Sequence, residues 1–165
     1  MKTKAAVAFG NAEPFEIHEI DVAPIKADEV RLRMVASGVC HTDAVARDLE
    51  GVFPLPGILG HEGSGIVEAV GADVSTMQVG DHVVLSFANC HRCDHCLSGH
   101  PTVCTEFNPL NFGGFLNGGD TPYSLNGQPL SIFFGQASFS QTVVTKADNV
   151  VVVDKEVDLE LLGPL

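Results

Sequence analysis

Four of the five cysteines in this 165-residue chain lie within one short segment, with the spacing C-x2-C-x2-C-x7-C. Four thiolates held this close can form a closed tetrahedral S4 site, which is the donor set of structural zinc. Residues 89–104 contain few apolar side chains, so a metal ion would replace a hydrophobic core there. The spacing therefore predicts a structural zinc bound by Cys90, Cys93, Cys96 and Cys104.

Two other interpretations of this segment are two disulfides or free thiols in a loop. The x2 spacings are awkward for pairing neighbouring cysteines, and the N-terminus resembles a strand more than a signal peptide. Clustered cysteines without a signal peptide favour reduced, metal-binding thiols in the cytoplasm. His91, His95 and His100 interleave with the cysteines and could compete as ligands, but four thiols already complete the shell.

Composition restricts the classes of partner and fold. The length predicts one domain, and 45% hydrophobic residues are enough for a core. A net charge of −12 argues against binding to nucleic acid or to an anionic membrane. No run of about 18 apolar residues is present, so we expect no membrane span.

The pattern along the chain predicts a mostly β fold with short helices. Residues 42–48 read as a short helix with Thr42 as a plausible N-cap. Residues 51–60 and 105–127 read as loops, and an apolar helical pattern begins at 157–162. Alternating or apolar runs predict strands at 5–9, 15–22, 28–37, 65–70, 82–87, 137–145 and 150–153.

A second motif lies upstream of the cysteine cluster. Residues 60–74 follow the pattern GHE-x2-G-x5-G-x2-V, with GVCHTD before it at 38–43 and GDHVV after it at 80–84. Together with the four-cysteine segment, these motifs resemble the zinc-containing alcohol dehydrogenases of the medium-chain dehydrogenase/reductase family, in order and in spacing. CHTD and the NFGG run at 111–114 resemble the aryl (benzyl) alcohol dehydrogenases within that family.

This resemblance implies a GroES-like, partly open β-barrel with a zinc-binding lobe at 89–104. We therefore expect residues 1–156 to form a catalytic domain and 157–165 to begin the helix that leads to a Rossmann domain. No G-x-G-x-x-G follows a strand in this sequence, so we expect a fragment that is inactive alone. The implied parent enzyme is a homo-oligomer that uses NAD(P) and zinc to oxidise primary alcohols, aromatic ones among them, to aldehydes.

The resemblance also assigns candidate site residues. Cys40 and His61 would be catalytic zinc ligands, and Glu62 would be an occasional third ligand. Thr42 would take the proton from the substrate alcohol, and Asp43 would orient a ligand. The family's third cysteine ligand has no counterpart among the five cysteines of this chain.

His41 matches the family position that faces the cofactor pyrophosphate. Family members with a longer proton relay carry a histidine where this chain has Val45. The relay is therefore absent or runs through other groups.

Simpler roles remain open for each of these residues. Cys40 alone would be a small buried hydrophobe, and Glu62 an ion-pair partner. Thr42 could be only an N-cap, and Asp43 could complement the helix dipole. His41 could be a solvated side chain, and His61 a satisfied polar group.

Two alternatives to the dehydrogenase fragment also remain open. The chain could be a stand-alone, non-catalytic zinc-binding module, or it could belong to a zinc dehydrogenase that acts on a polyol or a formaldehyde adduct. Four phenylalanines near the lobe favour an aromatic-lined pocket for a flat alcohol, unless they are ordinary core residues. They are Phe87, Phe107, Phe112 and Phe115.

Overall fold

Two β-sheets dominate the computed structural model, which describes residues 1–116 and 119–163. The first has the order β8 (Gln128–Pro129), β7 (Tyr123–Leu125), β2 (Glu16–Val22), β1 (Lys2–Ala8), β4 (Gly57–Ile58) and β9 (Ser131–Ile132). The second has the order β10 (Thr142–Lys146), β3 (Glu29–Ser37), β5 (Gly63–Val70), β6 (His82–Leu85) and β11 (Val150–Val153).

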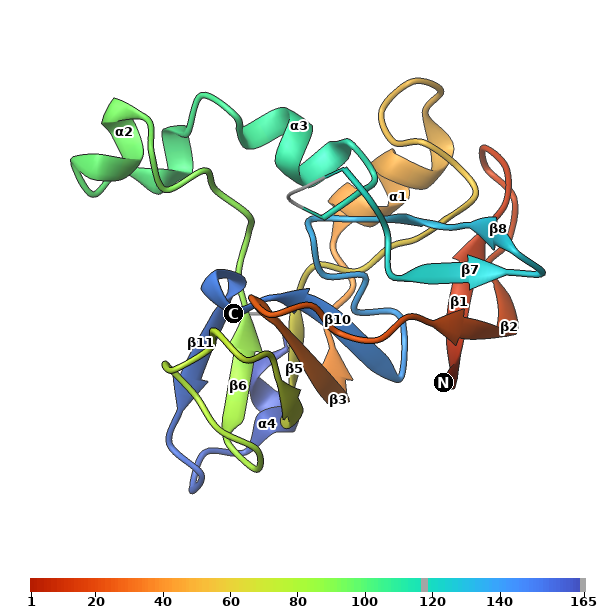
Figure 1. Ribbon diagram of the computed structural model, residues 1–165. Helices are drawn as coiled ribbons and strands as arrows, with labels where there is room; N and C mark the ends of the chain where they lie inside the picture. The colour runs from red at the N-terminus through yellow and green to blue at the C-terminus, as the bar shows by residue number, and fades with distance from the viewer. Residues whose placement is uncertain (117–118, 164–165) are drawn as a thin grey trace.

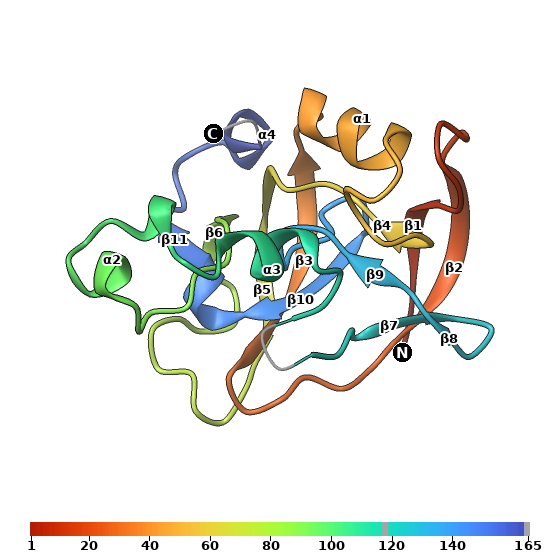
Figure 2. The same ribbon diagram turned by 90° about the horizontal axis from the view of Figure 1, so that it is seen from above.

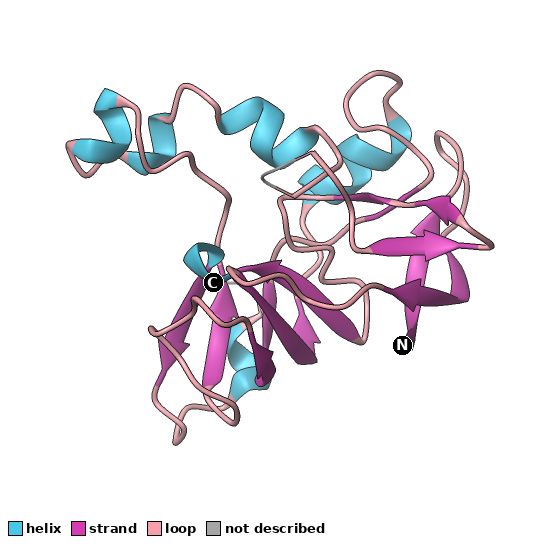
Figure 3. Cartoon of the chain, in the orientation of Figure 1, coloured by secondary structure: helices cyan, strands magenta, loops and turns pink. Residues whose placement is uncertain are grey.

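Short helices lie at the edges and on the outside of these sheets (Figure 3). The α-helices are α1 (His41–Asp48), α2 (Asp94–Leu97), α3 (Phe107–Phe112) and α4 (Leu159–Leu162), and 3-10 turns occupy Pro101–Val103 and Ala147–Asn149. In Figure 1, α2 lies well away from both sheets, and in Figure 2 it lies at the outer margin of the molecule on the side of β11, which marks the cysteine-rich segment as a separate lobe.

One segment joins the two sheets into a nearly closed barrel. Ala5 of β1 forms an isolated antiparallel bridge with Ser140. On either side of this bridge, the Ala6 N–H donates to the Phe139 carbonyl at 2.8 Å, and the Gln141 N–H donates to the Lys4 carbonyl at 2.9 Å. The mostly β, GroES-like barrel expected from the sequence is confirmed.

The alternation expected along residues 28–37 is present in β3. Val30 and Leu32 are fully buried, whereas Arg33 on the opposite face is exposed. The pairing of β3 with β5 shifts register twice, and such irregularities bend a strand. This bend carries the end of β3 toward the start of α1.

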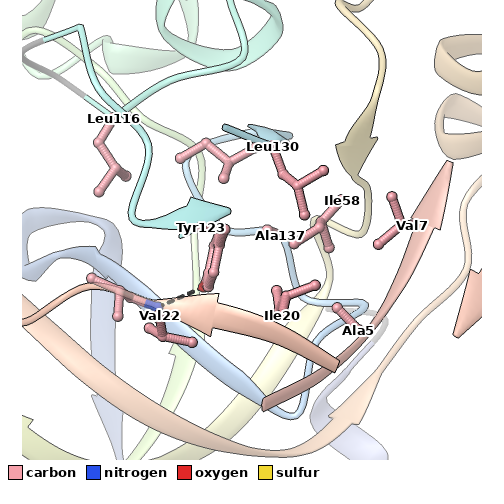
Figure 4. Close-up of a cluster of buried hydrophobic side chains, with 11 residues drawn as sticks. Ala5, Val7, Ile20, Val22, Ile58, Leu116, Tyr123, Leu130 and Ala137 are labelled. Carbon is pink, nitrogen blue, oxygen red and sulfur yellow. Dashed lines mark hydrogen bonds between the residues drawn. The ribbon is translucent and has the colours of Figure 1, made fainter. Parts of the chain in front are cut away.

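The core of the first sheet is built around Tyr123 (Figure 4). Its hydroxyl accepts from the Val144 N–H at 2.9 Å and donates to the Thr142 carbonyl at 3.2 Å. Because β10 is an edge strand, these bonds satisfy backbone groups that its sheet neighbour does not reach. The apolar residues around it come from both sheets: Ala5, Val7, Ile20, Val22, Ile58, Leu116, Leu130, Ile132, Ala137 and Val144.

The predicted loops contain elements that the sequence pattern did not indicate. The 51–60 segment includes β4, and the 105–127 segment includes α3 and β7. These elements have two to six residues, too few to show a hydrophobic period. The strand predicted from residue 137 begins only at Thr142, because Ala137 has φ +56°, which is incompatible with extended backbone. Residues 117–118 of the predicted loop lie outside the described residues.

The C-terminal helix predicted from residue 157 is present as α4, which starts later, after the N-cap Asp158. The Ser64 hydroxyl of β5 donates to the Leu159 carbonyl at 2.6 Å, and Leu159 is buried. This helix therefore packs against the second sheet. Residues 164–165 of the prediction lie outside the described part of the chain.

Candidate metal centres

Cys40 lies at the N-terminus of α1. It is the N-cap residue, with φ −99° and ψ 156°, and its sulfur accepts from the Thr42 N–H. The prediction that Thr42 is the N-cap was therefore wrong. The reason is the Asp43 side chain, which reaches back to the Cys40 N–H at 3.0 Å and completes a capping box that starts two residues earlier.

His61 enters the same site from the segment before β5. Asp43 is 2% exposed, and its Oδ1 atom accepts from the Gly60 N–H at 2.9 Å and lies 3.2 Å from His61 Nδ1. Gly60 has φ +89°, and a Cβ there would lie 2.5 Å from Ser138 Oγ. Asp43 thus fixes both Cys40 and His61, and its bond to Nδ1 leaves Nε2 of His61 free to bind a metal.

The ligand atoms of Cys40, His61 and Glu62 all lie within 4.8 Å of one another. Glu62 reaches this position because residue 38 is glycine: a Cβ on Gly38 would clash with the Glu62 carboxylate. The Gly38 N–H also donates to the Glu62 carbonyl at 2.8 Å. A sulfur, a ring nitrogen and a carboxylate at this spacing fit a zinc ion in type and number, with a fourth position open.

The pKa shifts of two of these groups have opposite consequences for metal binding: a lower pKa favours the thiolate form of Cys40, whereas a raised pKa means that a metal must displace a proton from His61. The Thr42 hydroxyl, 3.4 Å from the sulfur, is the main cause that lowers the pKa of the Cys40 thiol, followed by the Thr42 amide. Burial is the largest single influence on the pKa of His61 and lowers it, but the Asp43 carboxylate and the Cys40 sulfur together outweigh burial, and the pKa of His61 is raised. His41, in contrast, is exposed on the first turn of α1.

Phenylalanine rings surround His61 on its other side. Phe134 stacks on the imidazole with centroids 4.7 Å apart and planes 30° apart, and Phe133 meets it edge-on at 5.4 Å. Phe107 and Phe112 both contact Phe134, at 6.0 and 5.2 Å. Phe87 joins this cluster through Phe107 at 5.6 Å.

The sequence prediction named three members of this aromatic cluster and missed two. Phe133 and Phe134 lie between the predicted loop at 105–127 and the predicted strand at 137–145, and their only signal was two adjacent aromatic residues before a glycine. Phe115, which was predicted to join the others, instead lines a different cavity with Pro54 and Leu130.

The four clustered cysteines meet as their spacing predicts. Their sulfurs lie within 4.8 Å of one another, with Cys90 to Cys96 at 3.8 Å and Cys93 to Cys96 at 3.5 Å. A tetrahedron with Zn–S bonds of about 2.3 Å has edges of about 3.8 Å, whereas a disulfide needs about 2.05 Å. All five cysteines are free. The geometry fits a metal ion and not a pair of disulfides.

Backbone amides point at these sulfurs. The Cys93 N–H donates to Cys90 Sγ at 3.3 Å, and the Cys90 N–H donates to Cys104 Sγ at 3.4 Å. Amides of Cys96 and Thr105 lower the pKa of the Cys93 thiol to about 5, whereas desolvation and neighbouring thiols raise that of Cys96 to about 12. Because four negative sulfurs this close repel one another, all four can be thiolates at once only when a cation lies between them.

The rest of the lobe provides little apolar packing. Leu97 is 72% exposed and Val103 is 56% exposed. Within the described residues, the metal-ligand cluster contains the four cysteines and not the three interleaved histidines. His91 instead lies 3.7 Å from Asp148, and His100 lies 3.4 Å from the Ser98 hydroxyl.

The sequence matches the alcohol dehydrogenase GroES-like domain family over residues 26–155. The chain therefore belongs to this family, which confirms the predicted relationship to the zinc-containing alcohol dehydrogenases. Among residues 1–116 and 119–163, no helix has both the length and the apolar character needed to cross a membrane.

Curated relatives include two dehydrogenases with different substrates in their names. Geraniol dehydrogenase of Castellaniella defragrans is 46% identical over 167 residues, which are 100% of this chain and 44% of that protein. S-(hydroxymethyl)glutathione dehydrogenase of Escherichia coli is 42% identical over 170 residues, which are 99% of this chain and 46% of that protein. The chain thus spans less than half the length of these relatives.

Solved structures show the same fold. An alcohol dehydrogenase zinc-binding domain protein from Burkholderia ambifaria superposes with a TM-score of 0.95 at 44% identity, over 99% of this chain and 45% of that one. Benzyl alcohol dehydrogenase from Acinetobacter calcoaceticus gives 0.93 at 41% identity, over 99% and 44%. The predicted resemblance to benzyl alcohol dehydrogenases is confirmed at the level of sequence and fold.

We predict that Asp43→Asn destabilises the domain by about 2–3 kcal/mol. The carboxylate accepts hydrogen bonds from three donors, whereas the amide NH₂ of asparagine would face at least one of these donors with a second donor. Asp48→Asn on the same helix is the matched control and should cost less than about 1 kcal/mol, since Asp48 forms a surface ion pair with its neighbour Arg47. Urea denaturation of both variants measures the difference. Equal losses would show that Asp43 has no special structural role.

Proposed function

We propose that this chain forms the catalytic domain of an NAD(P)-dependent zinc alcohol dehydrogenase that oxidises primary alcohols, aromatic ones among them, to aldehydes. The observation that carries the proposal is the convergence of Cys40, His61 and Glu62 beside the Thr42 hydroxyl. Because the chain spans less than half of its relatives, the activity is proposed for a whole dehydrogenase that contains this domain.

We infer separate roles for the two metal centres. Cys90, Cys93, Cys96 and Cys104 would hold a structural zinc, since four thiols leave no position for substrate. Cys40 and His61 would hold the catalytic zinc, with Glu62 as a further or exchanging ligand. When bound, zinc makes an alcohol more acidic as a Lewis acid, and the nicotinamide supplies the hydride acceptor.

The chain's own residues would handle the proton. The Thr42 hydroxyl would accept it from the alcohol, since Thr42 lies beside the ligand Cys40. Val45, one turn further along α1, has no group to pass it on. The exposed His41, or the cofactor ribose, would therefore connect Thr42 to solvent. His41 would also face the cofactor pyrophosphate at the helix N-terminus.

Several further features of the whole enzyme belong to this proposal. A Rossmann domain outside this sequence would bind NAD(P), and the family resemblance favours a homo-oligomer. The reduced, clustered thiols favour the cytoplasm. The stand-alone zinc module remains the alternative, and it would hold the four-cysteine metal without needing Cys40 and His61 to converge.

The two metal centres should differ in affinity. Protein purified without added zinc should retain about one equivalent in the four-cysteine lobe, and a chelator should remove metal from Cys40 and His61 first, because a family ligand is missing there. Cys93→Ser should abolish binding of the zinc that resists the chelator, and it should speed amide hydrogen exchange across residues 89–104. Cys40→Ser is the control and should lose only the labile metal. Resistant zinc in Cys93→Ser would contradict the assignment.

Thr42→Ala should lower kcat of the whole dehydrogenase by roughly 10²–10⁴, the usual contribution of one proton-transfer group. Its zinc content should not change, because the hydroxyl is not a ligand. Thr42→Ser keeps the hydroxyl and should retain most of the activity. Near wild-type turnover in Thr42→Ala with both metals present would place the relay elsewhere.

The aromatic cluster beside His61 favours flat, apolar alcohols. Steady-state kinetics of the whole enzyme should therefore give a higher kcat/KM for benzyl alcohol than for ethanol. The E. coli relative named for S-(hydroxymethyl)glutathione shows that the family includes another substrate class. A clear preference for ethanol or for a formaldehyde adduct would rule out the aryl assignment.

A further inference from the structure

The fully buried side chain of Asn111 joins α3 to the base of the lobe. Its Oδ1 atom accepts from the Ala88 N–H at 2.9 Å, and its Nδ2 donates to the Ala88 carbonyl at 2.9 Å. The same Nδ2 donates to the Phe107 carbonyl at 2.8 Å, one turn back in α3. Asn111 thus pairs with both backbone groups of a residue two positions before Cys90, as a neighbouring strand would.

The backbone of Asn111 holds a second segment. Its carbonyl accepts from the Phe134 N–H at 2.8 Å. Phe134 has φ +54° and Ala137 has φ +56°, which are unfavourable for side chains other than glycine. Such a turn persists only where its surroundings fix it. Gln136 provides another tie, because its Nε2 donates to the Ser86 carbonyl at 2.9 Å.

This turn sets the position of the ring that stacks on His61. The imidazole is held at Nδ1 by Asp43 and on its face by Phe134. Phe107, which belongs to the same helix as Asn111, meets the Phe134 ring edge-on. A displacement of residue 111 would therefore move both the backbone and the ring of Phe134.

We propose that Asn111 is a positioning residue for the Cys40/His61 site: anchored on Ala88, it fixes the turn that presses Phe134 against His61. Its value for catalysis rests on the proposed function, but its effect on His61 does not. The chain of contacts runs from the base of the lobe through Asn111 and Phe134 to His61, so one buried amide links the two metal centres.

Asn111→Ser is the variant that isolates this role. A serine hydroxyl can still donate to the Phe107 carbonyl four residues back, but it cannot make the pair of bonds to Ala88. Asn108→Ser is the matched control, because Asn108 is exposed on the same helix. Val30→Ala is the control for lost stability, since Val30 lies in the separate core of the second sheet.

NMR of the His61 ring protons in the 165-residue chain is the direct readout. Asn111→Ser should shift them downfield, because they lose the shielding of the stacked ring, whereas Asn108→Ser and Val30→Ala should leave them unchanged. Cobalt(II) titration of the Cys40/His61 site should show affinity about 2- to 12-fold weaker in Asn111→Ser, the range expected for losing one aromatic pair.

Unchanged His61 resonances in folded Asn111→Ser, or the same shift in Val30→Ala, would overturn the proposal. Should Asn111→Ser fail to fold, Asn111→Asp is the second variant. It keeps the shape of the side chain and the hydrogen bond that Oδ1 accepts from the Ala88 N–H, but it loses the bonds that Nδ2 donates, so it must also shift the His61 ring protons downfield. Failure of the wild-type chain to bind cobalt at this site would count against the proposed function alone, because the ring shifts do not depend on metal.

Discussion

One buried carboxylate organises the candidate catalytic site. Asp43 is 2% exposed and receives the N–H groups of Cys40 and Gly60 as well as contacting the His61 ring. Burying a carboxylate without partners would be costly, and these partners offset that cost. Because the donors come from two separate segments of the chain, packing α1 against the β-barrel brings the sulfur and the imidazole together. The arrangement is thus a property of the chain itself.

The two metal centres depend on the fold in different ways. Cys40 and His61 are held by a capped helix, a strand and an aromatic cluster, all packed on the barrel. The lobe around α2 has exposed apolar side chains and lies apart from both sheets, so it relies on its thiols and their amide donors (Figure 1). In the lobe, a metal bound by the closed set of four thiols would stabilise the fold. In the barrel, a metal bound by Cys40 and His61 would keep an open position and could take part in a reaction.

Local patterns in the sequence predicted the components but not all of their contacts. The cysteine spacing and the GHE motif identified both ligand clusters, and the alternation along β3 identified its buried face. The N-cap was misplaced by two residues, because a side chain three positions later determines it. Asn111 was named only as the start of the NFGG run, and the positioning roles of Asn111 and Phe134 could not be predicted, since these roles arise from a left-handed turn and a buried amide pairing that link distant segments. Such features leave no periodic signal.

We infer that one chain builds both a closed S4 centre and an open mixed-ligand centre. Zinc K-edge X-ray absorption on the chain loaded with one and then two equivalents of zinc tests this claim most directly. We expect four sulfur neighbours at about 2.3 Å for the first equivalent, and additional nitrogen or oxygen neighbours at about 2.0–2.2 Å with the second. Nitrogen or oxygen in the shell of the first equivalent, or an unchanged all-sulfur shell after the second, would contradict it.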